Sequence, residues 1–252
     1  MHARSPDRQL GTLHLASAGL AGKAAFYTGV LGMRQTGPNV LGYGPGEVEI
    51  SFSEASGVYE PSPHDLYWKI AISVPDLDLA YRQLADKGVE VSQPRQFRDV
   101  GYLAHLSDPE GFQIELIQHV FEGVSKPPLR DADALGGGPC LNLVTLRTAD
   151  IDKVHQLCVQ QLEMKLICVE PVQEYGFTLY FFAFTDEVPP DPDPVAVINR
   201  AWTYQRPYTV LEAQHLHGAD AVGRQSQGGP GYVGLTTSGL DNAEDLLGLL
   251  PL

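Results

Sequence analysis

Residues 101–119, GYLAHLSDPEGFQIELIQH, predict a β-hairpin. Its turn, residues 108–111, supplies a side-chain acceptor, the fixed φ of proline and a permissive glycine, which a tight chain reversal needs. Successive strand side chains face opposite sides of a sheet, so Glu115 points away from its apolar neighbours. His105 has the same position on the incoming strand. The hairpin thus places an imidazole and a carboxylate mid-strand, on a face that is not simply solvent.

This hairpin resembles the last two strands of the βαβββ module of the vicinal oxygen chelate superfamily. That superfamily includes glyoxalase I, extradiol ring-cleaving dioxygenases and bleomycin-resistance proteins. Its members commonly use the glutamate after the turn as a ligand of a divalent metal. The resemblance gives that role to Glu115.

The same unit recurs along the chain. Predicted strands at residues 10–17, 67–74, 141–147 and 231–237 are each followed by a helical pattern. The helix motifs FYTGVLGM at 26–33 and LCVQQLEM at 157–164 end alike. The third unit is most similar to glyoxalase I, because its segments 176–184 and 206–215 resemble strands of that enzyme.

An aperiodic stretch rich in proline and glycine separates the second unit from the third. We therefore expect an α+β fold of tandem βαβββ modules that form two glyoxalase-like domains, residues 8–122 and 139–252, joined by a linker at 123–138. The fourth module starts at Gly231 but the chain stops at Leu252, so it is expected to be truncated. Residues 186–194 predict an acidic, proline-rich surface loop.

The composition of the chain limits the classes of partner that we expect it to bind. A net charge of -14 would repel nucleic acid and anionic membranes, and no apolar run is long enough to span a bilayer. Three cysteines without metal-binding spacing and no signal peptide favour a reducing cytoplasm. The expected partner is a small-molecule ligand, and a homodimer remains open.

The resemblance also implies where a site would lie. In the superfamily the sheet of each module faces a partner module across a cup. The polar strand faces would then line one cup, which brings together Thr12, His14, Glu49, Ser51, Lys69, His105 and Glu115.

The second metal ligand of the family is usually a histidine or glutamine eight residues before the first apolar residue of each helix. Those register positions hold Thr12, Lys69, Leu143 and Tyr232 here, none of which is a usual ligand. The glutamate half of the pattern persists at Glu49, Glu115 and Glu212. One divalent metal (Zn, Ni, Fe or Mn) held by His14, Glu49 and Glu115 and no metal at all are therefore both open. Lys69, which cannot coordinate while protonated, is a natural counter-ion for Glu49 or Glu115.

The candidate catalytic residues are Glu115 and Glu49, since a mid-strand carboxylate on an enclosed face is costly without a role. Candidate ligand-binding residues are Lys69, His105, Phe177, Leu179, Phe181 and Arg147. The aromatic and leucine side chains are equally typical of an ordinary core, His14 of a hydrogen-bonded cavity histidine, and Arg147 of a solvated strand end.

Three functions follow from the resemblance. The first is a metal-assisted lyase or isomerase of the lactoylglutathione lyase type, in which a glutamate such as Glu115 shuttles a proton. The second is a metal-free protein that binds or sequesters a small ligand. The third and weakest is an extradiol dioxygenase, because its two histidines are missing from the register positions.

Overall fold

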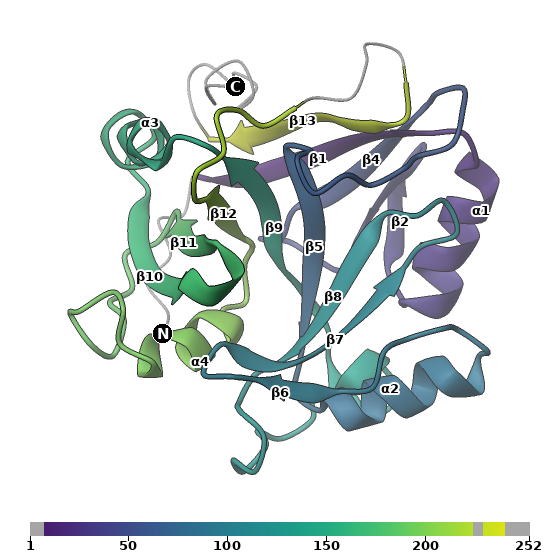
Figure 1. Cartoon of the computed structure of the whole chain (residues 1–252). Coiled ribbons are helices and arrows are strands. Elements are labelled where there is room, and N and C mark those ends of the chain that lie inside the picture. The colour runs from purple at the N-terminus through teal and green to yellow at the C-terminus, as the bar shows by residue number, and fades with distance from the viewer. Residues whose placement is uncertain (1–7, 224–228, 240–252) are drawn as a thin grey trace.

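The computed structural model describes residues 8–223 and 229–239. It confirms an α+β fold built from repeated modules (Figure 1). Apart from the strand at 231–238, the predicted fourth module lies outside the described residues, so its expected truncation stays a prediction. In the described part, no helix is long and apolar enough to cross a membrane.

The first sheet has five strands in the order β13-β1-β4-β3-β2. It joins the first module to the strand that opens the fourth, because β1 pairs antiparallel with β13. Its strands are β1 (Gln9–Ser17), β2 (Arg34–Gly37), β3 (Val40–Gly42), β4 (Glu49–Glu54) and β13 (Gly231–Ser238).

The second sheet has eight strands in the order β10-β11-β12-β9-β5-β8-β7-β6. It joins the second and third modules, because β5 pairs antiparallel with β9. The second module supplies β5 (Tyr67–Val74), β6 (Arg95–Phe97), β7 (Gly101–Ser107) and β8 (Gln113–Gln118), and the third supplies β9 (Cys140–Thr148), β10 (Lys165–Val172), β11 (Phe177–Ala183) and β12 (Val210–Leu216). One sheet thus crosses the predicted domain boundary, and the division into two domains stays a prediction.

The helices cover the outer faces of the sheets (Figure 1). α1 (Leu20–Ala25) and α3 (Ile151–His155) both continue into a π-helical turn, at Phe26–Val30 and Gln156–Gln161. The similar helix motifs therefore fold alike. α2 (Leu77–Asp86) starts at Asp76, whose side chain accepts from the backbone N–H of Leu79, and Gly88 follows it with φ 72°.

Two segments differ from expectation. The end of the linker is packed rather than loose, since Leu135–Gly137 form a buried 3-10 turn against Val74. After the acidic loop, α4 (Ile198–Tyr204) forms a short helix that the sequence pattern did not predict. The Tyr204 hydroxyl meets the backbone oxygen of Val100 at 3.1 Å, so α4 closes one end of the second sheet's concave face.

Candidate functional site

A cavity of about 230 Å³ lies on the concave face of the eight-stranded sheet. Cross-strand partners in a sheet share a face, which places Lys69, Glu115 and Glu212 on the same side. The cavity is lined by Trp68, Lys69, Arg95, Phe97, Val100, Leu103, His105, Glu115, Ile117, Leu143, Tyr175, Phe177, Leu179, Phe181, Tyr204 and Glu212.

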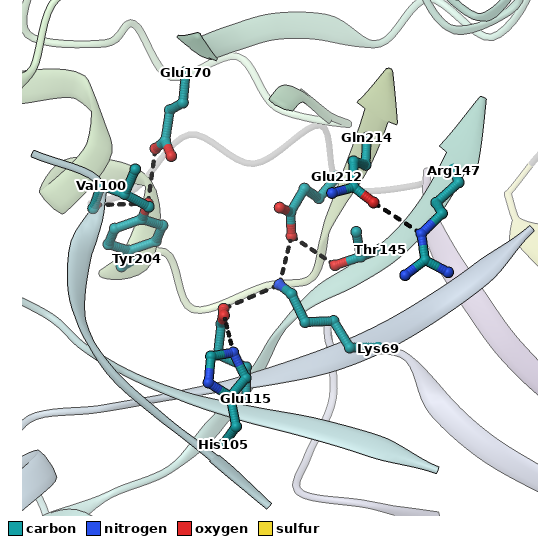
Figure 2. Close-up of polar contacts among 10 residues, drawn as sticks. All are labelled: Lys69, Val100, His105, Glu115, Thr145, Arg147, Glu170, Tyr204, Glu212 and Gln214. Atoms are coloured by element: carbon teal, nitrogen blue, oxygen red, sulfur yellow. Dashed lines mark hydrogen bonds and ion pairs between the residues drawn. The ribbon is translucent and has the colours of Figure 1, made fainter. Parts of the chain in front are cut away.

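The polar floor of the cavity is centred on Lys69 (Figure 2). Lys69 Nζ lies 3.0 Å from Glu115 Oε1 and 3.1 Å from Glu212 Oε2. Glu115 comes from the second module and Glu212 from the third, so one ammonium ties the two modules together. All three residues are buried.

Further polar groups flank the two carboxylates. His105 Nε2 lies 3.1 Å from Glu115 Oε2, and the Thr145 hydroxyl donates to Glu212 Oε2 over 2.6 Å. The His105 side chain is more open than the others and reaches toward the mouth. The cluster is thus a chain of ionic hydrogen bonds from the sheet centre to the cavity mouth.

The pKa values of the cluster follow from burial and charge. Burial alone would lower the pKa of Lys69, but Glu115 and Glu212 outweigh it and raise that pKa. Burial would raise the pKa of Glu115, yet the charge of Lys69 and the bond with His105 lower it. Glu212 shares the same ammonium, but burial and the nearby charge of Glu115 leave its pKa raised. Glu115 is therefore the ionised partner, and Glu212 is the more easily protonated one.

The walls of the cavity are apolar and aromatic. Phe177, Leu179 and Phe181 follow one another on the concave face of β11. Trp68 packs edge-on against Phe177 with 6.2 Å between ring centroids, and Phe97 packs against Tyr175 at 5.5 Å. An aromatic rim thus surrounds a charged floor.

Next to the wall, Glu170 on β10 forms a second buried acidic group, on the same face of the sheet as its cross-strand partner Leu179. The Tyr204 hydroxyl lies 2.7 Å from Glu170 Oε1, as Figure 2 shows, and Arg200 Nε lies 4.0 Å from the same oxygen. Burial raises the pKa of Glu170 to about 8. Glu170 Oε2 and Arg200 Nε have no hydrogen-bond partner within the described ranges. Glu170 is therefore largely neutral at pH 7 and does not itself line the cavity.

Six of the residues expected from the sequence meet in this cavity: Lys69, His105, Glu115, Phe177, Leu179 and Phe181. The expectation of one shared cup is wrong, because the structure does not place His14 and Glu49 in this cavity. His14 lies on β1 and Glu49 on β4, both in the five-stranded sheet. The counter-ion of Lys69 is accordingly Glu212 in addition to Glu115, and not Glu49.

Arg147 also lies outside the lining of the cavity. Its side chain donates to Gln214 Oε1 at 2.9 Å and to the backbone oxygens of Ser62 and Asp65 at 3.0 and 3.1 Å. Its guanidinium carbon lies 5.2 Å from the centre of the Trp68 ring. Arg147 therefore holds the loop that leads into β5, and its guanidinium packs against the ring of Trp68.

The residues present do not fit a divalent metal. His14, Glu49 and Glu115 are not brought together, and across residues 8–223 and 229–239 no three acidic, histidine or cysteine side chains form a metal-binding group. The two register positions of this sheet hold Lys69 and Leu143. A dication between Glu115 and Glu212 would meet the ammonium of Lys69.

Sequence reasoning missed several lining residues, among them Glu212, Trp68 and Tyr204. Glu212 was recognised as a register glutamate but was not assigned to a site, because its half of the chain has no other ligand. Strict alternation along β5 would place Trp68 on the face opposite Lys69, but a β-bulge between Tyr67 and Lys69 turns it into the cavity. Tyr204 lies on α4, whose short length gives little periodic signal.

Comparison with known proteins agrees with this architecture. Residues 10–116 match the sequence model of the Glyoxalase/Bleomycin resistance protein/Dioxygenase superfamily. No curated protein sequence matches the chain.

Solved structures extend the likeness to most of the chain. Glyoxalase I from Zea mays is 19% identical, with a TM-score of 0.64 over 91% of this chain and 74% of that one. A candidate dioxygenase from Bacillus subtilis subsp. subtilis str. 168 is 15% identical, with a TM-score of 0.55 over 90% of this chain and 68% of that one. At these identities the likeness shows the fold alone.

Proposed function

We propose that this chain is a small-molecule-binding protein whose cavity takes an apolar, aromatic ligand without a metal ion. The observation that carries the proposal is the position of Lys69. Its ammonium lies between Glu115 and Glu212, the carboxylates that the family resemblance would give to a metal. A fixed positive charge at that place offsets the buried carboxylates and disfavours a second cation.

The walls support the choice of ligand. Apart from its floor, the cavity presents mostly aromatic and aliphatic side chains. Cavities of about 150 Å³ hold one benzene ring, so about 230 Å³ suits a molecule of one or two rings. Enclosed apolar pockets with a few polar groups are typical of small-ligand sites.

A metal-assisted lyase is the main competing function. It would need a metal between Glu115 and Glu212, where Lys69 now forms both ion pairs and Leu143 offers no ligand. Elemental analysis of the purified protein, before any metal is added, tests the choice. We expect no stoichiometric zinc, nickel, iron or manganese, and one bound equivalent would favour the lyase.

Ligand binding is tested by calorimetry with 1-methoxynaphthalene. We expect binding to the natural chain and its loss in Leu179→Trp, because the larger indole fills the cavity beside Phe181. Val233→Trp is the matched control, since Val233 lies exposed on β13 of the other sheet. Equal binding by both variants would contradict the proposal, and so would the failure of both 1-methoxynaphthalene and 1-naphthol to bind the natural chain.

A further inference from the structure

Glu212 has one carboxylate oxygen that the protein does not use. Its Oε2 accepts from Lys69 Nζ at 3.1 Å and from the Thr145 hydroxyl at 2.6 Å. Within the described part of the chain, no group donates to Oε1 of Glu212. Figure 2 shows this oxygen turned away from both donors. Glu212 nevertheless lines the cavity, although only 1% of its surface is exposed.

The rest of the floor is already engaged. Both oxygens of Glu115 have partners, one in Lys69 and one in His105. Lys69 directs two of its three N–H groups to carboxylates, and its ammonium lies 4.8 Å from the centre of the Trp68 ring. Oε1 of Glu212 is thus a preformed acceptor at the floor, and it lacks a donor from the protein.

Oε1 of Glu212 faces the cavity, so a ligand that fills the cavity removes it from water, which is costly unless the ligand returns a donor. A ligand that supplies an O–H or N–H group would recover that cost. A ligand that carries its own negative charge would instead meet Glu115 and Glu212, whose two charges exceed the single charge of Lys69. The floor therefore selects by hydrogen-bond donation, and the apolar walls select by ring shape.

We propose that the ligand of this cavity is an aromatic molecule bearing a hydroxyl or amino group, which donates a hydrogen bond to Oε1 of Glu212. This inference rests on the proposed function and adds the polar group that the ligand must carry. Arg95, which is exposed, lines the cavity together with Lys69, and these two cations would attract an anionic ligand instead. The test therefore includes an anion.

The test compares ligands with one ring system and different substituents. Calorimetry at neutral pH with 1-naphthol, 1-methoxynaphthalene, 1-naphthaldehyde and 1-naphthoate separates a donor, a blocked donor, an acceptor and an anion. We expect 1-naphthol to bind roughly tenfold or more tightly than 1-methoxynaphthalene, as fits a hydrogen bond to a charged acceptor. The strongest binding by 1-naphthaldehyde would mean that Glu212 donates a proton, and by 1-naphthoate that Arg95 or Lys69 directs binding. Either result overturns the inference.

A substitution of Glu212 tests whether this residue causes the preference for 1-naphthol. Glu212→Gln replaces the charged acceptor with an amide, so 1-naphthol should lose its advantage over 1-methoxynaphthalene. Glu170→Gln is the matched control, because Glu170 is a buried glutamate of the neighbouring wall that does not line the cavity. This control should keep the preference. If Glu212→Gln does not fold, the ligand series on the natural chain still decides.

The two proposals fail in different ways. If none of the four compounds binds, the proposed function itself is wrong. If 1-naphthol and 1-methoxynaphthalene bind equally well, the cavity remains a binding site but Glu212 does not select a donor.

Discussion

Lys69 joins a carboxylate from each half of the chain, and its charge decides what the floor of the cavity can hold. A buried cation between two carboxylates is strongly coupled to both, so removal of one partner leaves an uncompensated charge. The sequence could predict that Lys69 is a counter-ion, because it occupies a register position beside Glu115. It could not predict Glu212 as the second partner, because that contact depends on which modules pair.

Replacement of Lys69 should therefore expose a latent metal site. We expect Lys69→His to gain affinity for zinc or nickel, because imidazole and two carboxylates then face one another. Without metal it should be less stable than the natural chain by about 3–5 kcal/mol. Lys69→Met is the control for lost charge, with similar destabilisation and weaker metal uptake. Thermal melts with and without metal, together with elemental analysis, check both expectations. Unchanged stability and metal content in Lys69→His would contradict the role of Lys69.

Glu170 should make stability fall as pH rises. Its pKa is raised from 4.5 to about 8, so the folded protein keeps a proton that the unfolded chain releases between these values. Each pH unit in this window then costs on the order of 1 kcal/mol. Urea unfolding of the natural chain and of Glu170→Gln, from pH 5 to pH 8, measures this effect. Relative to the natural chain, Glu170→Gln should become steadily more stable as pH rises.

An exposed control guards against general charge effects in that experiment. Glu174→Gln removes a glutamate whose side chain is 55% exposed and paired with Arg98. It should retain the pH dependence of the natural chain. A pH dependence that Glu170→Gln also retains would show that Glu170 is not the titrating group.

At the scale of elements, local sequence signals predict where the strands lie better than where a β-bulge interrupts them. The turn at residues 108–111 and the alternation of β8 place Glu115 and Ile117 on the cavity face as expected. The bulge in β5 breaks the alternation, because it arises from pairing with β9, which is distant in the sequence. Alternation alone would therefore place Trp68 on the face opposite the cavity.

The linker should be the first site of cleavage, yet a cut there should not separate the halves. Residues 122–126 and 128–133 are exposed, whereas the 3-10 turn at 135–137 is buried. Limited proteolysis with subtilisin should cut within 122–134. Because β5 and β9 pair across the boundary, the two fragments should elute together from a sizing column under native conditions. Primary cleavage within residues 67–91, or separate elution, would contradict this arrangement.

At the scale of the whole molecule, the pairing of modules decides which polar faces meet. The alternation of each strand correctly predicted a polar face on each module, but it carries no information about partners. β5 pairs with β9 and β1 with β13, so Lys69 and Glu115 face Glu212, while His14 and Glu49 remain on the other sheet. The two polar faces therefore lie on separate sheets, which is why they do not line one shared cup.

The two sheets are nevertheless cross-linked by buried polar contacts. Lys23 of α1 forms an ion pair with Asp108 in the turn between β7 and β8, and its ammonium lies 3.9 Å from the centre of the Phe112 ring. The backbone N–H of Val48 donates to the Thr209 hydroxyl at 2.8 Å. Each contact joins the first module to the eight-stranded sheet, so neither sheet can unfold without exposing partners of the other.

We therefore expect one cooperative unfolding transition. The two tryptophans, Trp68 and Trp202, belong to the eight-stranded sheet and α4, so their fluorescence follows the cavity region. Far-ultraviolet circular dichroism follows the whole chain. The two signals should change at the same urea concentration. Lys23→Met leaves Asp108 buried without its cation. It should lower the free energy of unfolding by about 3–5 kcal/mol and move both transitions to the same lower urea concentration. If fluorescence and dichroism separate in the natural chain, the sheets unfold independently, and the cross-links contribute little.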